Sequence, residues 1–355
     1  MNVLQVNTTY QGGGAEKVTQ QLFHSSFPGI TQHLLVGRGD REESKAKGYS
    51  MIYDGGIPWF CSRAYGKLAP YRRYDPYATH RIISYVKEHG IDIVHLQNIH
   101  GNYMGILDVE AIAKHAKIIW TLHDMWAMTG HCAHAFECDG YRRLDCSNCP
   151  RKETYPSIRT DCGDAILQDK KRAFTGKGIT FVSPSKWLKE RALESILAGE
   201  DLRVIENGSD TAGYGKYVGK KEELRQEYDI PKDRTVLLFA ASNLNSQFRS
   251  FGHLLDSLGY LEDRSAYTLI VLGNCDESVH FPEGFDVRLM GYIKDQDVMA
   301  KLYALSDAYV SPSLADNFPC TTVESFAVGT PVIAFASGGL VEQLSEGRGI
   351  LVPTG

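Results

Sequence analysis

Apolar residues in this chain form short continuous runs that alternate with stretches of helical spacing. Short apolar runs are typical of strands buried on both faces, and apolar positions three or four apart are typical of covering helices. The strands expected in the first half are residues 3–6, 33–36, 92–96, 117–122, 180–182 and 203–205. The helices expected there are residues 15–23, 79–89, 107–115 and 186–197. This alternation predicts a parallel sheet with helices on both faces.

The same alternation returns in the second half. Its expected strands are residues 236–240, 268–272, 287–290, 308–310 and 332–335, and its expected helices are 252–261, 297–305 and 321–328. A chain of 355 residues is long enough for two cores. We therefore predict two doubly wound α/β domains, 1–210 and 211–355, with the polar segment 206–221 as the linker.

Composition narrows the class of protein. A net charge of -5 does not favour a nucleic-acid binder, and 43% hydrophobic residues are typical of a soluble globular protein. We find no secretory signal and no apolar run long enough for a membrane span, so the sequence predicts a cytoplasmic protein. In that compartment, clustered cysteines more often bind metal than form disulfides.

A glycine loop follows the first expected strand. Gly12, Gly13 and Gly14 allow the backbone to approach a ligand at the carboxyl end of that strand, where open α/β sheets bind ligands. The loop is not a nicotinamide fingerprint, because Lys17 stands where that motif needs a glycine.

Residues 311–339 give the most specific signal, a strand end, a loop, a short helix and a further strand. Asp316 and Glu324 lie on either side of the expected helix N-terminus, where free N–H groups and the helix dipole favour an anion such as a diphosphate. A carboxylate beside an anion site is suited to bind hydroxyl groups. The alternative is a capping box, in which Glu324 of Thr321-x-x-Glu324 only caps the helix.

Candidate chemistry in the first half begins with His123, in the segment TLHDMW after an apolar strand. Active-site residues gather at such strand ends. Asp124 beside it either orients the imidazole or caps the following turn.

Four cysteines follow within the segment 131–150, and their spacing is typical of a closed structural zinc site. They are Cys132, Cys138, Cys146 and Cys149. The alternatives are reduced thiols, a pair of disulfides, or a site in which Cys162 or His131 replaces a ligand. A closed site has no open position for catalysis, so such a metal would order the loop.

Residues 58–77 interleave aromatic and basic side chains. This mixture suits a membrane interface or a lipid-diphosphate acceptor, and equally a packed helical excursion with solvated charges. The spacing of Asp295-Gln-Asp297 is that of a metal-binding D-x-D, but it directly precedes an amphipathic helix, so we expect it to cap that helix.

Several of these segments resemble family 4 glycosyltransferases (glycosyl transferases group 1). The family's donor-site motif resembles the pattern Asp316, seven residues, Glu324 and then GTPVIA. The resemblance extends to TLHD, to Asn207-Gly208 and to the glycine loop. The first acid is usually Glu in the family. The family's phosphate clamp has Arg and Lys where this chain has Asn243 and Arg249. Some members carry a similar cysteine-rich insertion after TLHDMW.

The resemblance implies a GT-B fold, two Rossmann-like domains facing each other across a cleft. It implies transfer of a sugar, with retention, from a nucleotide diphosphate sugar to a glycan or polyprenyl-diphosphate-linked acceptor in bacterial cell-surface polysaccharide biosynthesis. The location expected from the residues themselves is the cytoplasm, where 58–77 would give peripheral contact to the membrane's inner face. No nucleic-acid partner and no catalytic metal are expected. Family members continue with further helices, so we expect the second domain to be truncated.

The resemblance also assigns roles. Glu324 binds the ribose hydroxyls, Asp316 binds the sugar, and His123 contacts the sugar and the developing charge. The other donor-binding residues implied are Gly13, Gly14, Asn243, Arg249, Phe318, Cys320, Thr321 and Thr322. Two other classes remain open: another GT-B enzyme such as a sugar-nucleotide epimerase or a phosphorylase, and a catalytically silent nucleotide-sugar binder, favoured by Asn243 and Asp316.

Overall fold

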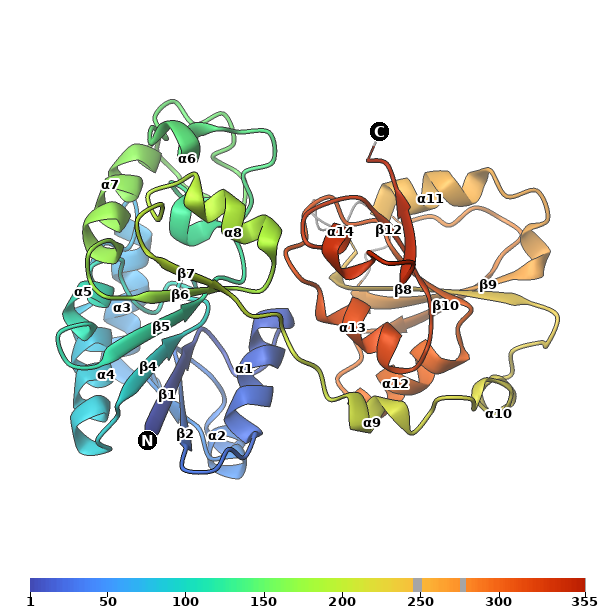
Figure 1. Cartoon of the computed structure of the whole chain (residues 1–355), viewed down its shortest axis with the longest axis horizontal. Coiled ribbons are helices and arrows are strands. Elements are labelled where there is room, and N and C mark those ends of the chain that lie inside the picture. The colour runs from blue at the N-terminus through green and yellow to red at the C-terminus, as the bar shows by residue number, and fades with distance from the viewer. Residues whose placement is uncertain (245–250, 275–278, 355) are drawn as a thin grey trace. The chain divides into compact units, whose positions relative to one another are not determined.

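The computed structural model describes residues 1–244, 251–274 and 279–354, without the side chains of Ile57, Arg63, Lys67, Ser242 and Asn243. The chain forms two compact units, Met1–Glu206 and Asn207–Gly355 (Figure 1). Each unit is built on its own parallel sheet, in agreement with the predicted alternation of strands and helices.

The first unit contains a seven-stranded sheet in the order β3-β2-β1-β4-β5-β6-β7. Its strands are β1 (Asn2–Asn7), β2 (Thr31–Val36), β3 (Ser50–Met51), β4 (Ile93–Leu96), β5 (Lys117–Thr121), β6 (Thr180–Ser183) and β7 (Asp201–Val204). Its helices are α1 (Gly14–His24), α2 (Arg41–Lys47), α3 (Gly56–Leu68), α4 (Pro76–Glu88), α5 (Asp108–Ile112), the 3-10 turn η1 (Trp126–Met128), α6 (Gly140–Arg143), α7 (Gly163–Phe174) and α8 (Lys186–Leu193).

The second unit contains a six-stranded sheet in the order β10-β9-β8-β11-β12-β13. Its strands are β8 (Thr235–Asn243), β9 (Tyr267–Asn274), β10 (Asp286–Gly291), β11 (Ala308–Ser311), β12 (Val332–Phe335) and β13 (Gly349–Val352). Its helices are α9 (Thr211–Gly215), α10 (Lys221–Glu227), α11 (Phe251–Gly259), the 3-10 turn η2 (Arg264–Ala266), α12 (Gln296–Leu305), α13 (Cys320–Ala327) and α14 (Leu340–Gln343).

Both sheets have a core on each face. Leu35 of β2 packs into one hydrophobic cluster, whereas its neighbours Leu34 and Val36 pack into another. In β8, Leu238 and Phe239 are divided between two clusters in the same way. Successive residues of a strand point to opposite faces, so a strand covered on both sides must be apolar throughout. That requirement explains the continuous apolar runs of the sequence.

Each sheet reverses its strand order at one place. β1 lies between β2 and β4, and β8 lies between β9 and β11. Open α/β sheets bind ligands beyond the carboxyl ends of the strands at this position. In the first unit the loops concerned follow Asn7 and Leu96, and in the second unit the described loop at this position follows Ser311.

The segment predicted to be a linker is partly structured. Within residues 206–221 the chain forms α9, and Tyr214 of this helix is only 2% exposed in the second core. Among the residues that the structure describes, no helix combines the length and the apolar character that crossing a bilayer needs.

Candidate functional site

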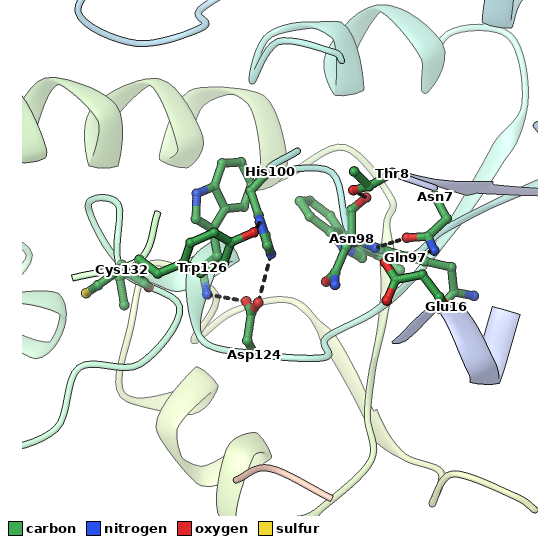
Figure 2. A network of polar contacts seen from close by, with 12 residues as sticks. Asn7, Thr8, Glu16, Gln97, Asn98, His100, Asp124, Trp126 and Cys132 are labelled. Carbon is green, nitrogen blue, oxygen red and sulfur yellow. Dashed lines mark hydrogen bonds and ion pairs between the residues drawn. The ribbon is translucent and has the colours of Figure 1, made fainter. Parts of the chain in front are cut away.

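The glycine loop of the first unit is held by a carboxylate of the helix that follows it. Gly13 is the N-cap residue of α1, and its N–H donates to the Glu16 carboxylate at 2.8 Å. The Asn7 side chain lies between the loops after β1 and β4, because its Oδ1 accepts from the Asn98 N–H at 3.2 Å (Figure 2). The predicted residues Gly13 and Gly14 therefore lie at the carboxyl end of β1, as expected.

His123 follows the end of β5. Its Nε2 lies 2.6 Å from Oε1 of Gln97, the residue directly after β4. Burial lowers the pKa of His123 to about 4, which outweighs the opposite effect of the neighbouring Asp124. The imidazole is consequently neutral at pH 7. Gln97, Asn98, His100 and Asp124 line a small pocket together with it.

Asp124 does not bind His123. Its Oδ2 lies 2.8 Å from Nε2 of His100, and its Oδ1 accepts from the Trp126 N–H at 2.8 Å (Figure 2). Burial opposes ionisation of this carboxyl, but the His100 partner and the Trp126 N–H together lower the pKa of Asp124. Of the two roles considered, capping the turn η1 is confirmed.

The four cysteines lie in the loops between η1 and α7, and all four are free thiols in the structure. His131 Nε2 lies 3.4 Å from the Cys149 sulfur. Among the described residues, however, no group of three or more Cys, His, Asp or Glu side chains is arranged to hold a metal ion. The described side chains therefore do not form the closed tetrahedral site that a structural zinc needs. The zinc stays a prediction, and metal analysis of the purified chain tests it.

A buried lysine fixes the start of this cysteine-rich segment. Lys170 of α7 is 0% exposed, and its ammonium donates to the carbonyls of Thr129 at 3.0 Å and Gly130 at 3.3 Å. It also lies 3.7 Å from the centre of the Trp126 ring. Burial lowers the pKa of Lys170 to about 7, against the opposing effects of Cys132, Asp124 and Cys146.

In the second unit, α13 begins directly after Pro319 and has no side-chain cap. Thr321 is therefore inside the helix, and its hydroxyl accepts from the Tyr309 phenol at 3.0 Å. The capping-box alternative is wrong for this reason. Glu324 is only 2% exposed and lies against Tyr214 of α9, where burial and then the Glu324 charge raise the pKa of the phenol.

The loop that carries Asp316 is braced by the strand-to-helix turn after β12. The Asp316 carbonyl accepts from the Gly339 N–H at 3.1 Å, and the Ser313 carbonyl accepts from the Ser337 hydroxyl at 2.6 Å. Gly338 has a φ of 54°, and a Cβ atom placed there would lie 1.9 Å from the Asp316 carbonyl oxygen. Only glycine allows this approach.

Two further side chains hold the end of the same loop. Asn207 donates from Nδ2 to the Phe318 carbonyl at 3.3 Å, and Gln343 donates from Nε2 to the Pro319 carbonyl at 3.2 Å. Phe318, Cys320 and Thr322 are all buried. A ligand at this helix N-terminus would thus meet mainly backbone N–H groups.

The predicted residues are divided between the two units. Gly13, Gly14 and His123 belong to the first, and Asp316, Phe318, Cys320, Thr321, Thr322 and Glu324 belong to the second. Asn243 ends β8, and Arg249 lies outside the described residues. Gln97 and Tyr214 were not predicted from the sequence. Gln97 could have been noticed, because it directly follows an expected strand.

The segment Asp295-Gln-Asp297 is confirmed as a cap. Asp295 is the N-cap residue of α12 and accepts the Asp297 N–H at 2.8 Å. The Asp297 carboxylate accepts from the Tyr217 phenol at 2.7 Å and pairs with Lys216. Both carboxylates therefore have structural partners within the second unit.

Comparisons with known proteins cover almost the whole chain. Residues 28–212 match the family described as Glycosyltransferase Family 4, and residues 234–355 match the one described as Glycosyl transferases group 1. The chain is 25% identical over 366 residues to WcaC of Escherichia coli, which carries the name of a colanic acid biosynthesis glycosyl transferase. That alignment covers 98% of this chain and 86% of WcaC.

Solved structures give the same fold. HepE of Anabaena in complex with UDP-glucose matches with a TM-score of 0.66 at 16% identity, over 100% of this chain and 86% of that one. WaaG, a glycosyltransferase involved in lipopolysaccharide biosynthesis, matches with a TM-score of 0.66 at 14% identity, over 99% and 86% of the two chains. These likenesses confirm the predicted GT-B class, with two Rossmann-like parallel-sheet domains.

Proposed function

This chain belongs to glycosyltransferase family 4, and from that premise we propose that it moves a sugar, with retention, from a nucleotide diphosphate sugar to an acceptor hydroxyl. The observation that carries the proposal is the N-terminus of α13, which lies between the loop of Asp316 and the buried Glu324. The name of WcaC supports cell-surface polysaccharide as the product class, and the HepE complex supports a nucleotide sugar as donor.

In this proposal the diphosphate binds at the N-terminus of α13, where the helix dipole favours negative charge. Glu324 binds the ribose hydroxyls while Tyr214 orients its carboxylate, and Asp316 binds hydroxyls of the sugar. Because His123 is neutral, it acts on the sugar by hydrogen bonding rather than by charge. Fixed donors that stabilise the departing diphosphate lower the barrier without a nucleophile.

We test donor binding by the thermal midpoint of the whole chain with UDP, GDP and ADP sugars. A donor at about one hundred times its dissociation constant adds about 2.7 kcal/mol of stability. We expect a shift with one base, and loss of this shift in Glu324→Gln. Glu346→Gln changes an exposed acid of the same unit and should keep the wild-type shift.

Turnover and its product separate the remaining alternatives. The proposal requires a glycoside whose anomeric configuration, measured by NMR, equals that of the donor. An altered sugar nucleotide as the only product would indicate an epimerase, and binding without any product would indicate a silent binder. The absence of a shift with every nucleotide contradicts the proposal.

Membrane contact through residues 58–77 is a second part of the proposal, and it rests on the exposed apolar side chains of α3. Trp59, Phe60 and Leu68 are 38%, 67% and 86% exposed. The two basic side chains that the structure describes here contribute less than the sequence indicated: Arg72 is buried and paired with Asp75, and Arg73 binds Asp169 at 2.7 Å.

Vesicle co-sedimentation tests this contact. With phosphatidylglycerol and phosphatidylethanolamine vesicles, Phe60→Ser with Leu68→Ser should weaken binding at least about tenfold, because each buried apolar side chain contributes roughly 1.5–3 kcal/mol. Leu144→Ser removes an exposed leucine of the same unit outside α3 and is the control. Equal binding of all three proteins would exclude α3 as the membrane contact.

A further inference from the structure

A row of three amide side chains, two of them buried, crosses the first sheet and ends at His123. Gln32 of β2, Gln5 of β1 and Gln97 after β4 lie on strands that are neighbours in the sheet. Gln5 donates from Nε2 to Gln32 Oε1 at 3.3 Å, and Gln97 donates from Nε2 to Gln5 Oε1 at 2.9 Å. Gln5 and Gln97 are each 1% exposed.

The backbone of Gln97 is fixed on both sides. Its N–H donates to the Val6 carbonyl at 2.9 Å, and its carbonyl accepts from the Trp120 indole at 3.0 Å. The side chain therefore has little freedom to turn away from its partners. A buried amide that is satisfied at both ends defines the orientation of whatever group it contacts.

The direction in which the amides of this row donate their hydrogen bonds determines which nitrogen of His123 carries the proton. Because the Gln97 amide nitrogen is used on Gln5, the atom that faces His123 Nε2, at 2.6 Å, is the acceptor Oε1. Nε2 must then be the donor. A neutral imidazole has one ring proton, so Nδ1 carries a lone pair.

Nothing in the described part of the first unit uses that lone pair, since the structure gives His123 Nδ1 no hydrogen-bond partner among the residues that it describes. The titratable groups that face the ring are His95, His100 and Asp124. Burial keeps the pKa of His123 at about 4, so the lone pair is present at neutral pH.

We propose that Gln97 is a positioning residue that fixes His123 as the Nε2–H tautomer, so that Nδ1 accepts a hydrogen bond from a hydroxyl group of the substrate. This inference rests on the proposed function, in which His123 contacts the sugar. A hydrogen-bond acceptor at this position distinguishes between substrates. It binds a sugar hydroxyl and repels a carboxylate in the same place. The site is therefore suited to a neutral hexose rather than to the corresponding uronic acid.

The tautomer itself can be measured without substrate. Long-range 1H–15N correlation spectra of the whole chain labelled at histidine nitrogens report which nitrogen is protonated, and the His123 signals are assigned by their loss in His123→Asn. We expect the Nε2–H form in the wild type, a mixture of tautomers in Gln97→Leu, and an imidazolium near neutral pH in Gln97→Glu. The Nδ1–H form in the wild type, or an unchanged spectrum in Gln97→Leu, would overturn the proposal.

Donor turnover then tests the consequence. Gln97→Leu should lower kcat/KM about tenfold, the loss expected for roughly one hydrogen bond. Gln97→Glu places a carboxylate beside Nε2 and raises the pKa of His123, so its rate should fall as the pH decreases through that raised value. The wild type should show no such decrease at neutral pH.

Val94→Ala removes volume from a buried residue of β4 but leaves the amide row intact, so it controls for loss of packing. It should keep the wild-type tautomer and pH profile, and circular dichroism checks that each variant is folded. A changed tautomer with unchanged kcat/KM would overturn the positioning role. Wild-type chain that turns over no donor would overturn the proposed function instead, and the spectra would still decide whether Gln97 fixes the tautomer.

Discussion

Among single residues, Asp108 is a buried acid whose pKa is shifted strongly by its environment. Its side chain is 0% exposed, and its oxygens accept the N–H groups of Asp75 at 3.0 Å and Gly105 at 2.6 Å. Burial raises the pKa of Asp108 to about 7 from 3.8, despite these two hydrogen bonds. Between these values the native state holds a proton that the unfolded state has released.

Asp108 should therefore lower the free energy of unfolding as the pH rises from about 4 to about 7, by about 3 kcal/mol. Asp108→Asn cannot titrate, so its stability should decrease less over this range. Urea unfolding of both proteins at several pH values between about 4.5 and 7.5 measures the difference. Parallel curves for the two proteins would show that Asp108 is ionised in the native state throughout.

The residue scale also shows what the sequence can predict about the site. His123 was found because strand ends of parallel sheets collect active-site residues, and the structure places it at such an end. Gln97 belongs to no motif, and its role depends on which strands are neighbours, a fact of topology rather than of local sequence. Likewise, no local signal distinguishes Arg72, which is buried against Asp75, from a solvated cation.

At the scale of elements, the turn between β12 and α14 decides where the Asp316 loop lies. Gly338 combines a φ of 54° with a Cβ position 1.9 Å from the Asp316 carbonyl oxygen. Gly338→Ala should lower stability by about 2–4 kcal/mol, because the strained backbone and the clash must both be relieved. The movement of the loop should also weaken donor binding at least about tenfold.

Gly329 provides the matched control. It also has a positive φ, 84°, but a Cβ atom there would have nothing within 4 Å. Gly329→Ala should cost only about 1 kcal/mol of backbone strain and should leave donor affinity unchanged. Urea unfolding and calorimetric titration with the donor measure both effects. Equal donor affinity in the two variants would mean that the Asp316 loop is not part of the donor site.

Elements were predicted well where burial dictates the pattern. The strand expected at 332–335 is observed as Val332–Phe335, and the one expected at 117–122 as Lys117–Thr121, because buried parallel strands must be apolar. Helix α2 was not predicted, since none of its residues is buried and its sequence carries no apolar period. Helix α13 begins at Cys320 with Pro319 as its N-cap residue. The pattern Thr321-x-x-Glu324 indicated a cap at Thr321 instead, so the start of the helix was predicted one residue too late.

At the scale of the whole molecule, the chain holds two separate sets of hydrophobic clusters. Among the described residues, two clusters lie within Met1–Glu206 and two within Asn207–Gly355, and none combines residues of both units. A unit with its own core can unfold cooperatively by itself. We therefore expect scanning calorimetry of the whole chain to show two transitions rather than one.

The donor should stabilise only one of these transitions. In the proposed function its diphosphate and ribose bind at α13, in the unit Asn207–Gly355, and a ligand raises the midpoint of the unit that binds it. The fragment 1–206, examined alone, should reproduce the transition that does not respond to a nucleoside diphosphate, which assigns the two peaks. A single transition in the whole chain, shifted as one by the nucleotide, would show instead that the units unfold together. Their separate cores would then be coupled in stability, since the free energy of binding at α13 would protect residues of both sheets.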